Sequence, residues 1–292
     1  MPGKQRKIER IAILSVYGLS AVALCCVLFL AGLFVYVSMG KDSEYDLKLV
    51  AWNVESGGND PKVIAQQLKD FSGYHVVALN EVNRKNIQTY KDALGSKFEL
   101  FMSETGGGDR LAILWDSNRL QLVSKTEMDK YQDHKFINSR HDRSPIFVRL
   151  NDNGQQFIVM TNHLASGDDE LRREQAVGLR EWARDSNEPI IAMGDFNFDY
   201  SFKRKSIKDP FREFMKDSVW LWVKPSPMID SHFSNDGDGN DEKPDSMLDF
   251  VFVANGAKEF ECQCSIIKRD GDFPDDESTS DHRATELRLN LN

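Results

Sequence analysis

Residues 190–197 read IIAMGDFN, an apolar run that passes directly into small and polar positions. Four consecutive apolar residues with turn-forming neighbours are typical of a buried strand, so we predict a strand over 190–193. The polar side chains that follow, Asp195 and Asn197, would then stand at the end of that strand. One such pair could simply form a turn. Polar residues at the end of a strand therefore indicate a functional site only if several strands of the chain show them.

Polar residues do follow other apolar runs or loops along the chain. They are Asn53, Glu81, Asn162 with His163, Asp249, and Asp281 with His282. Carboxylates, amides and histidines are the groups that bind a hard cation, activate water and hold a phosphoryl group. The set as a whole therefore indicates a site for phosphate and a divalent cation.

The surrounding pattern predicts an α/β fold. Apolar runs predict strands over 47–52, 75–79, 111–115, 146–150, 157–160, 190–193 and 250–253. Helices are expected over 61–71, 169–184 and 210–215, with Asp60 and Asp209 as N-caps before a proline. The irregular alternation of helices and strands favours two packed sheets with helices outside them.

Composition is that of a globular protein, with 40% apolar and 28% charged residues. The net charge is -9, and residues 1–40 carry four basic residues and one acidic residue, so the remainder is near -12. An acidic domain lacks the broad positive surface of a tight, non-specific nucleic-acid binder. The local basic cluster at residues 203–208 could grip a polyanion near the site, but a solvated loop is the favoured interpretation.

The N-terminus predicts a membrane anchor. Residues 11–39 contain no charged residue, which exceeds the ~20 residues that span a bilayer and the ~7 to 15 of a signal-peptide core. Basic residues precede this run and acidic residues follow it, so the positive-inside rule puts the N-terminus in the cytoplasm. We expect a cytoplasmic tail over 1–10, a transmembrane signal anchor over 11–39, a linker over 40–45, and a catalytic domain over 46–292 outside the cytoplasm, periplasmic or extracellular.

Six short motifs resemble, in order, those of the endonuclease/exonuclease/phosphatase superfamily, which has the DNase I-like fold. They are Trp52-Asn53-Val54-Glu55, Asn80-Glu81-Val82, Asn162-His163-Leu164, Gly194-Asp195-Phe196-Asn197, Leu248-Asp249-Phe250-Val251 and Ser280-Asp281-His282-Arg283. The resemblance spans about residues 48–285. It implies a four-layer α/β/β/α sandwich with the site at one end of the paired sheets.

The resemblance also implies residue roles. Glu81 would be the principal ligand of Mg²⁺, or of Mn²⁺ or Ca²⁺, with Asn53 and Asp281 close by. Asp195 would orient or deprotonate the attacking water, and Asn197 and His163 would contact phosphate. His282, oriented by Asp249, would act as base, acid or transition-state stabiliser. Asn162 and Arg110 are further candidates for phosphate contact, and Arg143 is a weaker one. The isolated histidines His75, His134, His141 and His232 are interpreted as surface or core residues.

The motifs are shared by branches with different substrates. We expect a nuclease that cleaves phosphodiester bonds with an activated water. The alternatives are a sphingomyelinase-like phospholipid phosphodiesterase and an inositol-phosphate phosphatase, followed by a catalytically inactive membrane-tethered binding module. The expected partners are nucleic acid or a phospholipid headgroup as substrate, and the membrane through the N-terminal helix. The sequence predicts no protein partner.

Overall fold

A computed structural model describes residues 45–139, 141–202, 207, 209–233, 246–273 and 278–291, and residues 46–292 form one compact unit. The predicted tail, anchor and most of the linker lie outside these residues. Within the described part of the chain, no helix has the length and apolar character needed to cross a bilayer.

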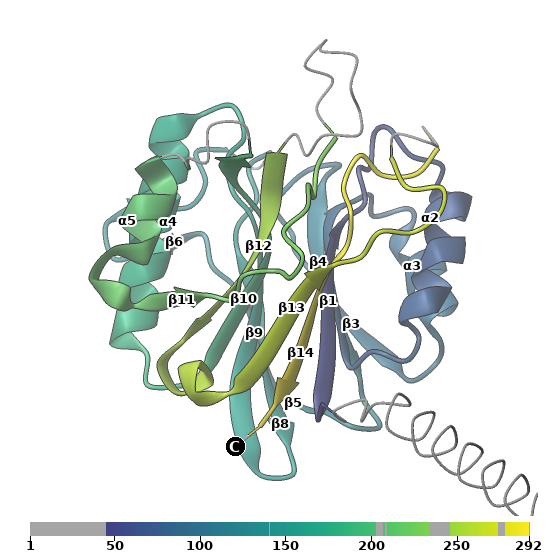
Figure 1. Cartoon of the computed structure of the whole chain (residues 1–292), viewed down its shortest axis with the longest axis horizontal. Helices are drawn as coiled ribbons and strands as arrows, with labels where there is room; N and C mark the ends of the chain where they lie inside the picture. Colours follow the sequence, from purple (N-terminus) through teal and green to yellow (C-terminus); the bar gives the residue numbers. More distant parts are fainter. Residues whose placement is uncertain are drawn as a thin grey trace, which may run out of the picture. The chain divides into compact units, whose positions relative to one another are not determined.

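Two six-stranded mixed sheets form the centre of the unit (Figure 1). The first sheet has the order β13-β14-β1-β2-β4-β3, and the second has the order β11-β12-β10-β9-β8-β5. The strands of the first are β1 (Leu47–Asn53), β2 (Val76–Val82), β3 (Phe98–Met102), β4 (Arg110–Asp116), β13 (Glu261–Ile266) and β14 (Thr285–Asn290). Those of the second are β5 (Gln121–Glu127), β8 (Ile146–Asp152), β9 (Gln155–His163), β10 (Ile190–Ser201), β11 (Trp220–Trp222) and β12 (Ser246–Ala254).

Helices cover the outer face of each sheet, which gives the four layers that we predicted. Figure 1 shows α2 (Pro61–Leu68) and α3 (Ile87–Leu94) beside the first sheet, and α4 (Asp169–Asp185) and α5 (Asp209–Met215) beside the second. Short 3-10 turns span Lys69–Phe71, Lys216–Ser218 and Asn255–Glu259, and β6 (Lys130–Tyr131) pairs with β7 (His134–Lys135).

The three hydrophobic cores follow from the period-2 alternation of the strands. In β1, Leu49 and Ala51 face the core between the two sheets, whereas Val50 and Trp52 face the core under α2 and α3. A third core lies between the second sheet and helices α4 and α5. Both faces of the central strands are therefore covered, which explains why their sequences are continuously apolar.

All seven predicted strands and all three predicted helices are present, but several bounds were wrong. The helix expected over 61–71 ends at Leu68 and continues as the 3-10 turn, while Asp60 caps it by accepting from the backbone N–H of Lys62 at 2.9 Å. Asp209 is the first residue of α5 and not its cap. The elements that were not predicted from the sequence are β3, β5, β6, β7, β11, β14 and α3. Strand β5 alternates exposed and half-buried residues, so it lacks an apolar run.

Candidate active site

The predicted site residues lie on neighbouring strands at one end of the two sheets. His163, Asp195 and Asp249 form a row across β9, β10 and β12, because Asp195 pairs with both of the others. In the first sheet Asn53 is the last residue of β1, and Glu81 lies near the end of β2. The packing of the sheets therefore brings residues from distant parts of the chain together.

We predicted that Asp195 and Glu81 follow their strands. Both residues instead lie within their strands, close to positions where the pairing register shifts. The β10–β12 register shifts between Asp195 and Tyr200, and the β2–β4 register shifts between Leu79 and Val82. Glu81 has φ 55° and Asn197 has φ 51°, both in the left-handed region. A bulge turns a side chain out of its regular direction, which is how these polar groups leave the sheet face.

Gly194 permits a close approach between the two sheets. Its φ is 129°, and a Cβ at this position would lie 2.5 Å from the carbonyl oxygen of Asn162 and 2.9 Å from Oδ1 of Asn80. The Asn80 side chain accepts from the backbone N–H of Asp195 at 3.0 Å and donates to Oγ1 of Thr161 at 3.1 Å. Asn80, to which we had assigned no role, therefore joins the sheets beneath the site.

Around Asp195 the polar groups converge. Nδ2 of Asn53 donates to Oε1 of Glu81 at 3.1 Å and to Oδ2 of Asp195 at 3.2 Å. Nε2 of His163 lies 3.4 Å from Oδ2 of Asp195 and 3.7 Å from Oε1 of Glu81. The backbone N–H of Asn197 donates to Oδ1 of Asp195 at 2.9 Å. Both oxygens of the Asp195 carboxylate are thus held in place.

His282 is oriented by a buried carboxylate, as predicted. Its Nδ1 lies 2.8 Å from Oδ2 of Asp249, which also accepts from the Ser231 hydroxyl at 2.7 Å. The Nε2 atom on the other side of the ring is 3.9 Å from Oδ2 of Asp195 and 3.8 Å from Oδ1 of Asp281. The Asp249 carboxylate therefore fixes the ring with Nε2 facing the site.

The pKa values of these groups move in opposite directions. Burial alone lowers the pKa of His282, but the charges of Asp249, Asp195 and Asp281 outweigh it and raise the pKa to about 10. Burial, aided by Arg143 and His282, holds the pKa of His163 well below its usual range. Burial and the charge of Asp249 raise the pKa of Asp195 to about 7. At pH 7 the site thus contains a cationic His282 and a neutral His163 beside Asp195.

Asn162 and Arg110, the two further candidates for phosphate contact, differ in their hydrogen bonding. Asn162 is fully buried next to the site, and neither its amide oxygen nor its amide nitrogen has a hydrogen-bond partner in the described part of the chain. Arg110 instead donates to the carbonyl oxygens of Ser103 at 2.6 Å and Gly107 at 3.2 Å. Two of its three guanidinium nitrogens, Nε and Nη1, are therefore bound to its own loop. Arg143, a weaker candidate from the sequence, is the cation whose charge reaches His163.

The predicted metal ligands do not all meet directly. Asn53 contacts Glu81, but its amide oxygen already accepts from the backbone N–H of Glu55 at 3.0 Å. Oε2 of Glu55 accepts from the backbone N–H of Asp281 at 3.0 Å. Burial and the charges of Asp281 and Glu81 raise the pKa of Glu55. The carboxylate of Glu55 is therefore repelled by both other acidic groups. A divalent cation would relieve this repulsion, so the donor set fits a hard metal ion.

His232, which stands alone in the sequence, lies next to the candidate site in the structure. Its Nε2 lies 3.7 Å from Oδ2 of Asp281, and its ring centroid is 4.7 Å from that of His282. Burial and the charge of His282 lower the pKa of His232 to about 4. Its flanking residues gave no signal, since the contact arises from a bridge between residues 232 and 282.

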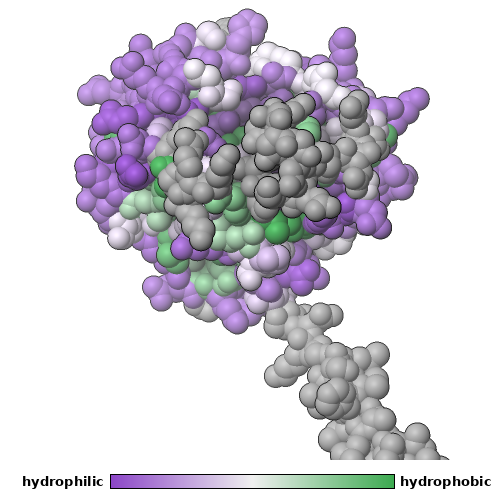
Figure 2. All heavy atoms as spheres, turned by 45° about the horizontal axis from the view of Figure 1, so that its top comes forward, coloured by the Kyte–Doolittle hydropathy of each residue, from purple (hydrophilic) through white to green (hydrophobic). Residues whose placement is uncertain are grey.

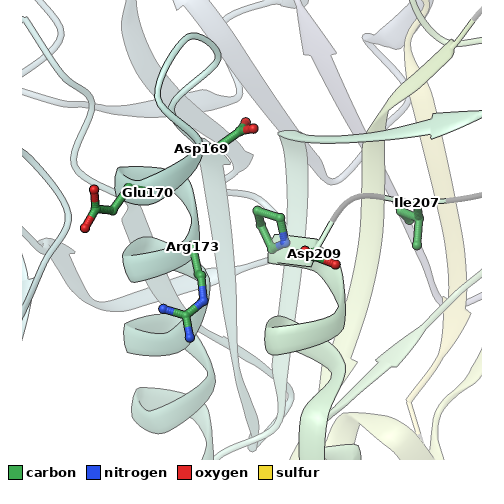
Figure 3. A pocket seen from close by; sticks show the side chains of 6 residues that line it. Asp169, Glu170, Arg173, Ile207 and Asp209 are labelled. Atoms are coloured by element: carbon green, nitrogen blue, oxygen red, sulfur yellow. The ribbon is translucent and has the colours of Figure 1, made fainter.

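A separate hollow of about 510 Å³ lies between the N-terminal ends of α4 and α5 (Figure 3). Asp169, Glu170, Arg173, Ile207, Asp209 and Pro210 line it. None of the predicted site residues is among them, and its acidic rim would repel a phosphate. It is thus not part of the candidate active site.

Comparisons with known proteins agree with this geometry. The model of the Endonuclease/Exonuclease/phosphatase family matches residues 50–282, whereas no curated protein matches the chain significantly. Among solved structures, a humanized TDP2 of D. rerio has a TM-score of 0.65 at 17% identity, covering 84% of this chain and 99% of that one. A mannosyl-6-phosphatase of Bacteroides thetaiotaomicron has a TM-score of 0.63 at 15% identity, with coverage of 84% and 100%. The human Nocturnin catalytic domain has a TM-score of 0.59 at 17% identity, with coverage of 83% and 94%. At these identities the similarity shows the fold.

Proposed function

Because the chain belongs to the endonuclease/exonuclease/phosphatase family, whose members are phosphoesterases, we propose that it is a divalent-metal-dependent nuclease that hydrolyses phosphodiester bonds. The observation that carries this proposal is the placement of Asp195 between two buried histidines. Its Oδ2 lies 3.4 Å from Nε2 of His163 and 3.9 Å from Nε2 of His282. A base, a proton donor and a fixed positive charge thus converge on one point, as hydrolysis of a phosphate ester requires.

Glu81, Asp281 and Asn53 would hold the metal ion, with Glu55 supporting Asp281. The expected ion is Mg²⁺, because the donors are oxygen atoms, and Mn²⁺ or Ca²⁺ would be accepted by the same kind of ligand. When bound, such an ion would supply positive charge that stabilises the negative phosphate in the transition state.

The protein side chains would share the remaining work. Asp195, held by Asn53 and by the backbone N–H of Asn197, orients a water molecule and takes its proton. The unpaired Asn162 amide and the His163 ring donate hydrogen bonds to phosphate oxygens. His282 places its protonated Nε2 where charge develops on the phosphate or the leaving oxygen, while Asp249 holds the ring.

Aromatic side chains near the site support nucleic acid as the substrate. Tyr200 and Phe202, at the end of the strand that carries Asp195, have ring centroids 5.2 Å apart, and Trp222 lies 6.2 Å from Tyr200. All three are only partly buried. Figure 2 turns this end of the molecule forward and shows hydrophobic residues among the hydrophilic ones. Unpaired bases stack on aromatic rings, whereas an inositol phosphate has no comparable apolar face, so the accessible parts of these rings favour nucleic acid.

The same apolar surface would also suit a lipid, so a phospholipid phosphodiesterase is the second candidate. We further propose that residues 11–39 anchor the chain in a membrane with the N-terminus in the cytoplasm and the catalytic domain outside. The uncharged length and the flanking charges support this orientation. An outward domain would meet extracellular or periplasmic nucleic acid, or lipid headgroups.

A substrate panel tests the proposal. Purified residues 41–292 are incubated with Mg²⁺ and plasmid DNA, RNA, sphingomyelin or inositol phosphates, each with and without EDTA. Cleavage of DNA or RNA that stops with EDTA is the expected result. Cleavage of sphingomyelin alone would transfer the protein to the phospholipid branch. Absence of hydrolysis on every substrate would favour the inactive binding module.

A further inference from the structure

Two residues of the candidate active site, Asp281 and His282, form a group of three potential metal ligands with His232, which has no role in the proposed mechanism. The ligand atoms of His232, Asp281 and His282 all lie within 4.8 Å of one another. Within this group Nε2 of His232 is 3.7 Å from Oδ2 of Asp281, and Nε2 of His282 is 3.8 Å from Oδ1 of the same carboxylate. The two imidazoles thus approach one carboxylate from its two oxygens.

Both rings are held so that Nε2 is the atom they present. Nδ1 of His282 lies 2.8 Å from Oδ2 of Asp249, and Nδ1 of His232 lies 3.3 Å from the hydroxyl of Ser246. In metal sites a histidine ligand ordinarily uses one ring nitrogen and donates its other N–H to an oxygen, which fixes the ring. The supporting oxygens of such a site are therefore already in place for both histidines.

The donor set differs from that of the magnesium site. Two nitrogen donors and one carboxylate suit a borderline transition ion, whereas Mg²⁺ prefers oxygen ligands only. Nitrogen and oxygen ligands bind Zn²⁺ at about 2.0 to 2.2 Å, so two ligand atoms of one tetrahedral ion lie about 3.3 to 3.6 Å apart. The separations of 3.7 Å and 3.8 Å between the imidazole nitrogens and the Asp281 oxygens are only slightly larger. Three protein ligands would leave a fourth position open.

We propose that His232, Asp281 and His282 form a second, inhibitory metal site that takes Zn²⁺ or a similar transition ion. Binding replaces the proton on Nε2 of His282, which is released to solvent, and occupies the carboxylate of Asp281. Both residues are thereby withdrawn from hydrolysis. The inhibitory effect rests on the proposed function, but binding of the ion does not.

The decisive variant is His232→Phe, because it removes one ligand of the inhibitory site without altering any residue placed in the catalytic machinery. Zn²⁺ inhibition is measured in excess Mg²⁺, and binding is followed by the visible absorption of Co²⁺ and by calorimetry with Zn²⁺, also in excess Mg²⁺. We expect His232→Phe to keep its Mg²⁺-supported activity. It should bind Zn²⁺ at least ~10-fold more weakly than the wild type. Loss of a group that only hydrogen-bonds to a metal ligand already lowers metal affinity by about 10- to 100-fold, and His232 would be a ligand itself.

Two further variants control for indirect effects. His134→Phe removes a histidine whose Nε2 is 3.2 Å from Oε2 of Glu181, outside the inhibitory site, so its Zn²⁺ inhibition should match the wild type. Ser246→Ala keeps all three ligands but frees the His232 ring, and it should weaken binding by a smaller factor than His232→Phe. Circular dichroism confirms that each variant is folded.

The outcomes separate this inference from the proposed function. If no substrate is hydrolysed but Zn²⁺ binding depends on His232, the site stands and the hydrolase proposal fails. If the enzyme hydrolyses its substrate while His232→Phe and the wild type bind and respond to Zn²⁺ equally, the inhibitory site is overturned. Equal weakening in His134→Phe would also overturn it, because binding would then not be specific to this cluster.

Discussion

The pairing of Asp249 with His282 leads to the sharpest prediction at the scale of single residues. Their contact of 2.8 Å is buried, and in the proposed mechanism both residues act on the reaction through Nε2 of His282. His282→Ala should reduce kcat/KM by ~10² to 10⁴-fold, the usual contribution of a general acid or base. Asp249→Asn should remove most of the same contribution, because the ring loses its orientation and its basicity.

The double mutant should be scarcely worse than either single mutant, since residues that act as one unit are not additive. The measurement is kcat/KM for the wild type, the two single mutants and the double mutant, with circular dichroism as the folding control. Losses that multiply fully would mean that the two residues act independently.

The charge of Glu81 should determine how tightly the protein binds Mg²⁺. Glu81→Gln keeps the side-chain size and removes the charge, so Mg²⁺ affinity should fall at least ~10-fold, with a matching loss of activity at limiting Mg²⁺. Calorimetric Mg²⁺ titration and activity assays measure the two effects. Glu99→Gln, at an exposed acidic position on the edge strand β3, is the matched control. Activity that persists in EDTA would reject the metal-dependent mechanism.

The raised pKa of His282 predicts how stability depends on pH. In the folded protein its pKa is about 10, above the ordinary value of 6.5, so the native state binds the extra proton between these values. The stabilisation is complete below pH 6.5 and is lost as the pH rises towards 10. In EDTA, the free energy of unfolding should therefore fall by the order of a few kcal/mol from pH 7 to pH 10.

Denaturant unfolding at pH 7, 8, 9 and 10 measures this fall. His282→Gln should flatten it, whereas His134→Gln should not, because the pH response is assigned to the buried pair with Asp249. Parallel curves for the wild type and His282→Gln would show that another group is responsible.

At the scale of elements, Gly194 determines how closely β10 approaches β9 and the side chain of Asn80. A Cβ at Gly194 would lie 2.5 Å from a backbone oxygen, at a φ of 129° that other residues rarely adopt. Gly194→Ala should therefore cost about 2 kcal/mol or more of stability. It should also lower activity, because Asp195 is the next residue.

Thermal and denaturant unfolding check this prediction against Gly57→Ala. No atom lies within 4 Å of a Cβ at Gly57, so that variant should stay within about 0.5 kcal/mol of the wild type. Equal stability of the two variants would contradict the close approach that we describe for β10.

At the scale of the whole molecule, the anchor hypothesis predicts on which side of a membrane the catalytic domain lies. Protease added to intact cells, or to spheroplasts if an outer membrane is present, should digest the domain, because the flanking charges favour a cytoplasmic N-terminus. Immunodetection of the domain is the measurement, and a cytoplasmic protein is the control. Protection in both preparations would reject the outward orientation.

The sequence by itself predicted the layers and named most of the residues that the structure brings together around Asp195. Apolar runs such as 190–193 mark buried strands because burial is a local property, written in the residues themselves. The strands that were missed, such as β5, are the ones that lie half exposed and have no such run. The motifs identified Asp195, Asp249 and His282 because each stands in a short segment of characteristic composition.

Only the tertiary structure decided which of these residues meet and which others join them. His232 reaches His282 through a bridge between segments 50 positions apart, and Asn80 reaches Asp195 from the opposite sheet. Arg110 was assigned to phosphate from its flanks, yet two of its three guanidinium nitrogens are bound to carbonyl oxygens of its own loop. Such contacts depend on strand order and on bulges that redirect side chains, and period-2 alternation encodes neither.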